Sequence, residues 1–137
     1  MRVLVTGGAG FIGSALIRYL VREAGVEVLN VDKITYAGNL ASLKDVETRP
    51  NCRFLKADIC AKRIMAEAFD SFRPDRVMHL AAESHVDRSI NAAGNFIESN
   101  IVGTFTLLEA ARAYWNSLPA FARTTFRFVH VSTDEVY

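Results

Sequence analysis

The sequence has 137 residues, of which 50% are hydrophobic and 23% are charged. That is enough apolar material for one packed domain, and it excludes an intrinsically disordered chain. Its 16 basic and 15 acidic residues leave a formal net charge of +1, so nothing in the balance favours nucleic acid or an anionic membrane as a partner. No apolar run approaches the ~20 residues of a membrane span, and the N-terminus lacks a signal peptide, so a cytoplasmic location is expected.

Short apolar runs alternate along the chain with amphipathic stretches. The runs predict strands over residues 3–5, 26–31, 52–57, 76–80 and 126–131. Helical spacing predicts helices over residues 11–23, 62–72 and 95–115, and the polar segment 33–50 predicts a loop with at most one helical turn. In the last helix one stripe, which we expect to pack in the core, contains Ile97, Ile101, Phe105, Leu108 and Ala111.

Cysteine and histidine side chains give no sign of a metal site. Cys52 and Cys60 are too few and wrongly spaced for a zinc site or a disulfide framework, so both are interpreted as small buried residues and no metal is expected. His79 and His130 lie in predicted strands and are interpreted as hydrogen-bonded core residues.

Alternation of strands and helices predicts an α/β fold, in which crossover helices cover both faces of a doubly wound parallel sheet. We expect one such domain over residues 1–137. A sheet of this kind binds ligands at the carboxyl ends of its strands, near the point where the strand order reverses. The residues directly after each strand are therefore the candidates for a site.

The first strand is followed by three glycines, Gly7, Gly10 and Gly13, that lead into the first helix. In a dinucleotide-binding turn these positions give the tight turn, the close approach of backbone to a pyrophosphate, and the packing of helix on strand. The helix N-terminus then offers N–H groups to the phosphates. A P-loop is excluded, because Ser14-Ala15 stands where that motif requires Lys-Ser/Thr.

Asp32 closes the second strand, where a carboxylate accepts both hydroxyls of an adenine ribose and repels a 2′-phosphate. This favours NAD over NADP as the cofactor. Lys33 is the opposing feature, because its cation could serve a phosphate. Asp58 and Ile59 follow the third strand, where they are placed either to contact the adenine or to form an ordinary turn.

Four segments resemble dTDP-glucose 4,6-dehydratases, a family of extended short-chain dehydrogenases/reductases with a Rossmann-type NAD-binding domain. They are Asp32-Lys33-Ile34-Thr35-Tyr36-Ala37-Gly38-Asn39-Leu40, Leu80-Ala81-Ala82-Glu83-Ser84-His85-Val86-Asp87-Arg88-Ser89, Asn100-Ile101-Val102-Gly103-Thr104 and Val131-Ser132-Thr133-Asp134-Glu135-Val136-Tyr137. The resemblance covers the whole chain but only the N-terminal part of such an enzyme. Plant-type UDP-glucose 4,6-dehydratases share the Thr-Asp-Glu triplet, so the base of the nucleotide stays open.

The resemblance implies an enzyme that converts dTDP-glucose to its 4-keto-6-deoxy form by oxidation at C4, loss of water across C5–C6 and return of the hydride to C6. It assigns Asp134 as the acid for the C6 hydroxyl, Glu135 as the base for the C5 proton and Thr133 as a hydrogen-bonding partner near the C4 oxygen. Ser84 is expected to contact cofactor and substrate, and His85 is a candidate for the wall of the site. The complete enzyme is expected to be a homodimer.

The residues expected to bind NAD lie at or after the ends of the first four predicted strands, and one further residue, Ser99, lies on the long helix. They are Gly7, Gly10, Phe11, Ile12, Gly13, Asp32, Lys33, Ile34, Thr35, Asp58, Ile59, Leu80, Ala81, Ala82, Ser84 and Ser99.

Enzymes of this family use a Tyr-x-x-x-Lys pair beyond the fifth strand for hydride transfer, and no tyrosine of this sequence is followed four residues later by lysine. We therefore expect a fold truncated after its fifth strand, an incomplete dimer interface and no catalysis by the 137 residues alone. Two alternatives remain: another nucleotide-sugar dehydratase or epimerase of the family, and a non-catalytic NAD-binding module.

Overall fold

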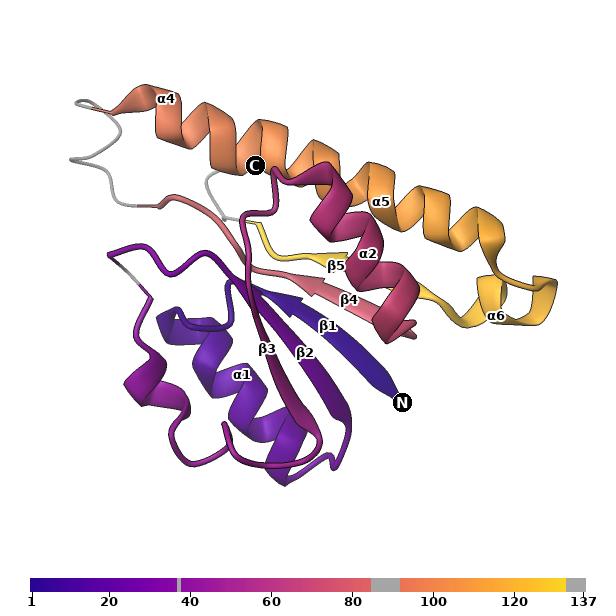
Figure 1. Cartoon of the computed structure of the whole chain (residues 1–137), viewed down its shortest axis with the longest axis horizontal. Helices are drawn as coiled ribbons and strands as arrows, with labels where there is room; N and C mark the ends of the chain where they lie inside the picture. The colour runs from indigo at the N-terminus through magenta and orange to yellow at the C-terminus, as the bar shows by residue number, and fades with distance from the viewer. Residues whose placement is uncertain (37, 85–91, 133–137) are drawn as a thin grey trace.

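Five parallel strands form the sheet, in the order β3–β2–β1–β4–β5 (Figure 1). The computed structural model describes residues 1–36, 38–84 and 92–132. The strands are β1 (Arg2–Thr6), β2 (Glu27–Asp32), β3 (Cys52–Lys56), β4 (Arg76–His79) and β5 (Arg127–His130). Their order reverses between β1 and β4, which is the Rossmann-type arrangement, so the predicted fold class is confirmed.

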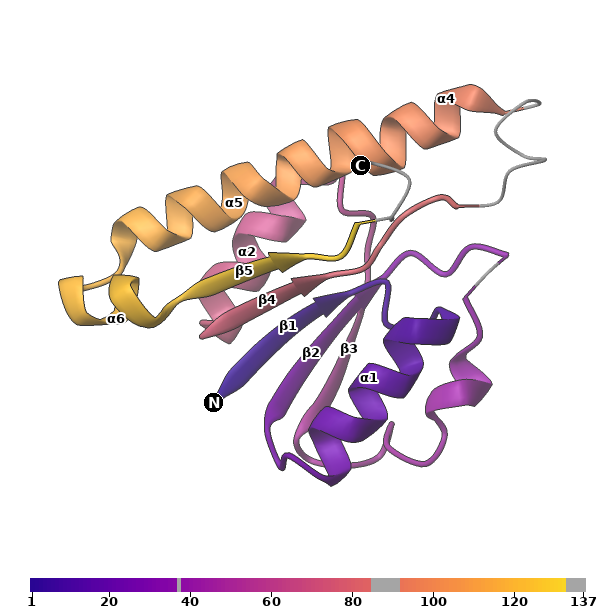
Figure 2. The ribbon, with the colours of Figure 1, turned by 180° about the vertical axis from the view of Figure 1, so that it is seen from behind.

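Helices cover both faces of the sheet (Figure 2), and an apolar cluster lies between each face and its helices. Helix α1 (Phe11–Arg22) covers one face, where Val3 and Val5 of β1 pack against Ile17, and the 3₁₀ turn η1 (Leu40–Leu43) lies beside it. Helices α2 (Lys62–Phe72) and α5 (Thr104–Ser117) cover the other face, where Leu4 belongs to their cluster. Successive residues of β1 thus face opposite layers, which explains its unbroken apolar run.

The long helix predicted over residues 95–115 exists, but it is a composite of three segments. Helix α4 (Ala93–Phe96) leads into η2 (Ile97–Gly103), a π-helical segment, and this continues as α5. The short helix α6 (Ala120–Thr125), which follows Pro119 before β5, was not predicted.

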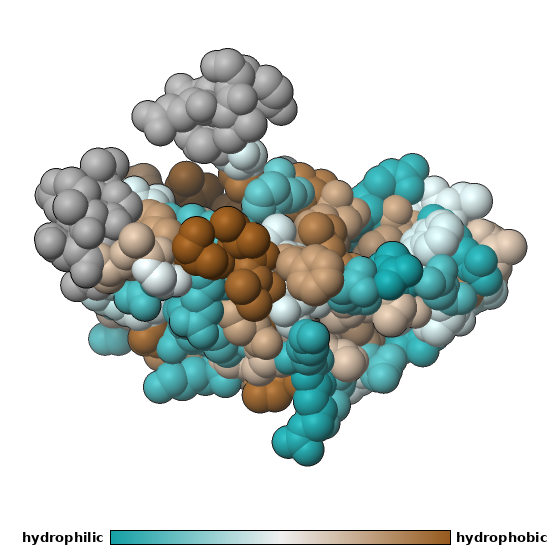
Figure 3. Space-filling view, turned by 90° about the horizontal axis from the view of Figure 1, so that it is seen from above, coloured by the Kyte–Doolittle hydropathy of each residue, from teal (hydrophilic) through white to brown (hydrophobic). Residues whose placement is uncertain are grey.

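The predicted core stripe of this composite helix is wrong for four of its five residues. Ala111 is buried, whereas the exposed fractions of Ile97, Ile101, Phe105 and Leu108 are 54%, 59%, 57% and 45%. The face that packs on the molecule is a second stripe, formed by Ser99, Gly103, Leu107, Ala111 and Tyr114. Small residues let the helix come close, since a Cβ on Gly103 would lie 2.7 Å from the side chain of Ile59. The large apolar residues of the other stripe therefore face away from the sheet and are exposed, and Figure 3 shows brown, hydrophobic surface on this side of the molecule.

The histidine and cysteine expectations are confirmed in one case out of four. His79 has no exposed surface and is hydrogen-bonded on both sides, through Nδ1 to the Thr6 hydroxyl at 2.6 Å and through Nε2 to the Thr104 hydroxyl at 2.9 Å. His130 is exposed, because β5 is an edge strand, and its ring lies 4.9 Å from that of His79. Cys52 and Cys60 are only half-buried.

We predict that His79 makes the fold sensitive to mild acid. Burial, assisted by the charge of His130, lowers the pKa of His79 from 6.5 to about 4. The unfolded chain takes up this proton first, so the free energy of unfolding should fall as the pH falls from 6.5 to 4, by at most about 3 kcal/mol. Denaturant titrations at several pH values should show this fall, and His79→Asn should flatten it while His130→Asn should keep it. An equal slope in the wild-type protein and His79→Asn would contradict the assignment.

Candidate functional site

A cavity of about 370 Å³ lies at the carboxyl ends of the strands. Fourteen of the 16 predicted cofactor-binding residues line it: Gly7, Gly10, Phe11, Ile12, Gly13, Asp32, Lys33, Thr35, Ile59, Leu80, Ala81, Ala82, Ser84 and Ser99. Ile34 and Asp58 are not among the lining residues, although each is next in sequence to one that is. The lining also contains Val31, Gly38, Ala57, Glu83 and Val131. Ala57 and Val131 directly follow β3 and β5, but both lie inside the strands predicted from the sequence.

The glycine turn is built on a close approach between β1 and β4. Gly7 has φ +73°, and its N–H donates to the Val31 carbonyl at 3.0 Å. A Cβ at this position would lie 2.6 Å from the backbone nitrogen of Ala81, and a Cβ on Gly13 would collide with the Gly7 carbonyl oxygen. Gly7 therefore permits the tight turn, and Gly13 permits the start of the helix to pack on that turn, where the spacing predicted packing on the strand.

The N-terminus of α1 opens into the cavity without a side chain to cap it. Gly10 is the N-cap residue and makes no side-chain hydrogen bond, and the first turn carries no acidic residue. The free N–H groups of this turn and the positive end of the helix dipole are thus available to an anion. A Cβ on Gly10 would meet only the Gly7 carbonyl oxygen, at 3.3 Å, so the space above it is open.

Asp32 is held between the glycine turn and the loop after β2. Its Oδ2 accepts a hydrogen bond from the Ala9 N–H at 2.9 Å, and its Oδ1 accepts one from the Ile34 N–H at 2.8 Å. Ile34 has φ +55°, a left-handed conformation that a β-branched residue rarely adopts. Each carboxylate oxygen retains a second lone pair, so the group can accept further hydrogen bonds from a ligand.

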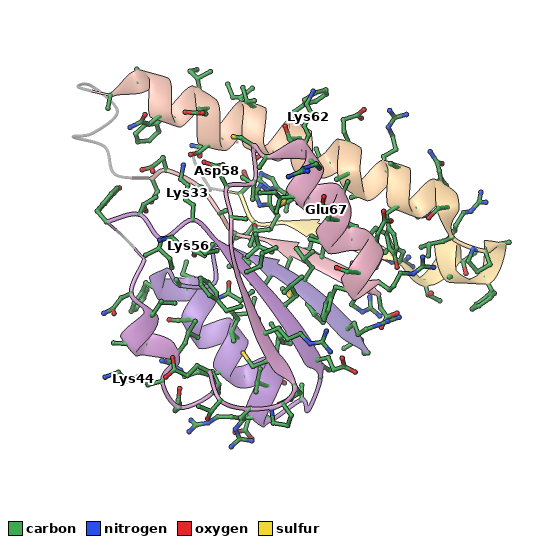
Figure 4. The ribbon with its side chains drawn as sticks, in the orientation of Figure 1. Lys33, Lys44, Lys56, Asp58, Lys62 and Glu67 are labelled. Carbon is green, nitrogen blue, oxygen red and sulfur yellow. The ribbon has the colours of Figure 1, made fainter. Side chains whose placement is uncertain are left out.

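Lys33 contacts Asp58, in the loop after β3, and Ser99 of η2; Figure 4 shows Lys33 beside Asp58. Its Nζ donates to the Ser99 hydroxyl at 2.9 Å and lies 3.4 Å from Oδ2 of Asp58. Oδ1 of Asp58 accepts from the Cys60 N–H at 2.9 Å. Partial burial raises the pKa of Asp58, but the hydrogen bonds from Cys60 and the charge of Lys33 outweigh it and hold this pKa below its ordinary value.

The loop after β4 is fixed from both sides. The Leu80 N–H donates to the Thr6 carbonyl at 3.1 Å on the β1 side. On the helix side, the Asn100 amide makes two hydrogen bonds of 2.8 Å to the backbone of Glu83, donating to its carbonyl and accepting from its N–H. Asn100 was quoted in the resemblance but given no role, and only the fold shows that its amide holds this loop.

The acid/base candidates Thr133, Asp134 and Glu135, and the wall candidate His85, lie outside the described residues. β5 brings the chain to the cavity, because the Val131 N–H donates to the His79 carbonyl at 3.0 Å and Val131 lines the cavity. Among the described residues no group of three or more His, Cys, Asp or Glu side chains could hold a metal ion. Within the same ranges, no helix has the length and apolar character needed to cross a membrane.

The family described as GDP-mannose 4,6 dehydratase matches residues 4–137. The chain belongs to this family. The probable dTDP-glucose 4,6-dehydratase of Sinorhizobium fredii is 64% identical over 137 residues, and the dTDP-glucose 4,6-dehydratase of Neisseria meningitidis is 60% identical over 136. These matches cover 100% and 99% of the chain but only 39% and 38% of the relatives, whose N-terminal part it resembles. The predicted resemblance is confirmed.

Solved structures of similar proteins superpose on the chain over nearly its whole length. The DesIV dTDP-glucose 4,6-dehydratase of Streptomyces venezuelae, with NAD and TYD bound, is 45% identical with a TM-score of 0.86, over 99% of this chain and 40% of that one. A UDP-glucose 4-epimerase of Thermotoga maritima with UDP-glucose is 33% identical with a TM-score of 0.81, over 97% and 38%. The shared fold therefore extends across enzymes of different reactions.

We predict that Gly7→Ala destabilises the protein by about 2–4 kcal/mol, because left-handed backbone strain and the overlap with Ala81 add together. Gly25→Ala is the matched control, since Gly25 has φ +61° but nothing within 4 Å of the added Cβ. It should cost only the strain, roughly 1–2 kcal/mol. Urea unfolding of both variants gives the comparison, and equal losses would contradict the close approach.

Proposed function

We propose that this chain is the NAD-binding part of a dTDP-glucose 4,6-dehydratase, the enzyme that converts dTDP-glucose to dTDP-4-keto-6-deoxyglucose. The observation that carries the proposal is the cavity at the switch point, where an uncapped helix N-terminus and the Asp32 carboxylate face the same space. The similarity to dTDP-glucose 4,6-dehydratases supports the choice of substrate.

The described residues fit a dinucleotide. The glycine turn leaves room where any side chain would intrude, the first turn of α1 has no carboxylate to repel a pyrophosphate, and Asp32 has lone pairs left for ribose hydroxyls. Ala81 and Ala82 form a small-residue wall on the β4 side. NAD, when bound, supplies the hydride acceptor and donor for the chemistry at C4 and C6.

Within this proposal the elimination of water falls to the residues after β5. Glu135 removes the C5 proton, Asp134 protonates the departing C6 hydroxyl, and Thr133 donates a hydrogen bond at the C4 oxygen. Two carboxyl groups can divide acid and base work when their surroundings separate their pKa values. Neighbouring residues of a strand face opposite sides, so both carboxyls reach one sugar only where the chain leaves strand geometry. Ser84, which lines the cavity, is proposed to contact both cofactor and substrate.

A nucleotide-sugar 4-epimerase is the second candidate, because solved UDP-glucose 4-epimerases share this fold. The Thr133-Asp134-Glu135 triplet favours dehydration over epimerisation, since the resemblance gives epimerases small residues at the last two positions. The similarity to dTDP-glucose 4,6-dehydratases favours thymine over uracil as the base of the nucleotide.

A homodimer in the cytoplasm completes the proposal. The exposed apolar stripe of the composite helix is the described surface that best fits a second copy (Figure 3). Sedimentation of the full-length gene product tests the dimer. The cytoplasm is proposed because nucleotide sugars and NAD are available there.

We predict that the full-length gene product binds NAD, as measured by titration calorimetry. Asp32→Asn should weaken this binding about 10- to 100-fold, because the new amide turns a donor towards a backbone N–H and loses the charge that holds the ribose. Asp45→Asn is the control, since Asp45 pairs with Arg22 at 2.9 Å outside the cavity lining. A folded sample that binds no NAD would contradict the cofactor assignment.

We predict that Glu135→Gln in the same gene product abolishes the exchange of the C5 hydrogen of dTDP-glucose with deuterated solvent, because an amide cannot act as the base. Mass spectrometry of recovered sugar nucleotide measures this. Loss of exchange together with loss of the 4-keto-6-deoxy product supports dehydration. Epimerisation at C4 that continues unaffected by the substitution would replace it with the second candidate.

A further inference from the structure

Lys33 poses a problem for a site that takes NAD. It directly follows the carboxylate proposed to hold the ribose hydroxyls, and a lysine ammonium at that position would attract a 2′-phosphate. Asp32 carries the opposing charge, and its two oxygens already accept hydrogen bonds from the Ala9 and Ile34 N–H groups. A second interaction, one that engages the Lys33 ammonium, is needed to keep this lysine from favouring NADP.

Two segments that are distant in the sequence provide this interaction. Asp58, from the loop after β3, lies 3.4 Å from the Lys33 ammonium, and Ser99, from η2, accepts its hydrogen bond at 2.9 Å. Figure 4 shows Lys33 and Asp58 beside each other, on the side of the sheet where α2 lies. Of the described acidic residues, Asp58 is the one paired with Lys33.

Both partners of the lysine are themselves held in place. Asp58 is fixed by the Cys60 N–H at 2.9 Å, so its carboxylate does not have to be ordered by the lysine. Ser99 is buried, with 5% of its surface exposed, on the face of η2 that packs inward. The pair of Lys33 and Asp58 is about one-third exposed, at 34% and 37%, so the ammonium could leave it if a stronger anion competed.

We propose that Asp58 and Ser99 determine the preference for NAD over NADP by occupying the Lys33 ammonium. The inference rests on the proposed function, because it concerns the same cavity and the same cofactor. Asp58 and Ser99 act through Lys33 and are positioning residues. A 2′-phosphate then meets the carboxylate of Asp32 without the compensating cation that the sequence places beside it.

The test measures the dissociation constants of NAD and NADP by titration calorimetry on the full-length gene product. Asp58→Asn keeps a carbonyl oxygen for the Cys60 N–H, so the loop is preserved while the charge that holds Lys33 is lost. We expect the ratio of the NADP to the NAD dissociation constant to fall about three- to ten-fold. Ser99→Ala removes the hydrogen bond without changing charge, and the ratio should fall about two-fold.

Two controls separate release of the lysine from simple loss of a negative charge. Asp45→Asn makes the same change of charge at an aspartate of equal exposure, since Asp45 and Asp58 are both 37% exposed. It should change the ratio less than about two-fold, because salt screens the interaction of a distant surface charge with the cofactor. In the Lys33→Met background, Asp58→Asn should also leave the ratio nearly unchanged. Circular dichroism and a melting curve establish that each variant is folded.

The outcomes distinguish this inference from the proposed function. If the folded wild-type protein binds neither dinucleotide, the proposed function fails and the inference with it. If NAD binds but Asp58→Asn changes the ratio no more than Asp45→Asn does, only the inference is overturned. The same conclusion follows if NADP binding stays undetectable in the Asp58→Asn variant. An Asp58→Asn effect that persists in the Lys33→Met background also overturns it, since the aspartate would then act directly on the phosphate.

Discussion

The backbone of Gly7 and the backbone of Ala81 touch at the switch point, and the geometry of the site depends on this contact. β1 and β4 are neighbours in the sheet, but their chains continue to opposite faces, so a cavity opens where they part. A side chain at Gly7 would push the two loops apart. The glycine turn, the uncapped end of α1 and the loop after β4 are therefore placed relative to one another by one close approach.

A second close approach holds η2 against the loop after β3, and both segments line the cavity. The π-helical segment η2 presents Ser99 and Gly103 inward, and Gly103 lies against Ile59 at the end of β3. This brings the Asn100 amide within reach of the loop after β4 and the Ser99 hydroxyl within reach of Lys33. π-helical turns are rare and occur frequently at functional sites, and this one lies where two cavity-lining loops are held.

The fold class and most of the cavity lining could be predicted from the sequence, because they depend on local patterns. Alternating apolar runs determine the strands, and the rule that ligands bind after strand ends selects Gly7 and Asp32 without tertiary information. The lining residues after the fourth strand, from Leu80 to Ser84, were predicted from the resemblance. The orientation of the composite helix could not be obtained this way. Its largest apolar residues form one stripe and its small residues another, and hydrophobicity selects the first, whereas the close approach to Ile59 requires the second.

Contacts between side chains from distant segments also could not be predicted from the sequence. Nothing local indicates that Lys33 contacts Asp58 and Ser99, since those partners lie 25 and 66 residues further along the chain. The exposure of His130 follows from the edge position of β5, which depends on strand order and not on the strand's own sequence. Residues 133–135 carry the proposed acid/base chemistry and lie outside the described residues, so their predicted roles rest on the resemblance.

The left-handed Ile34 has a consequence for anyone who wishes to re-engineer the cofactor preference. The Asp32 carboxylate holds this residue in a conformation that costs a β-branched side chain about 1–3 kcal/mol, and the same carboxylate anchors the glycine turn through Ala9. Asp32 is thus a structural brace as well as a ligand group, and replacing it alone removes a support of the loop together with the charge. A successful redesign has to exchange the segment from Asp32 to Gly38 as one unit, with a residue at position 34, such as glycine or asparagine, that adopts positive φ with little strain.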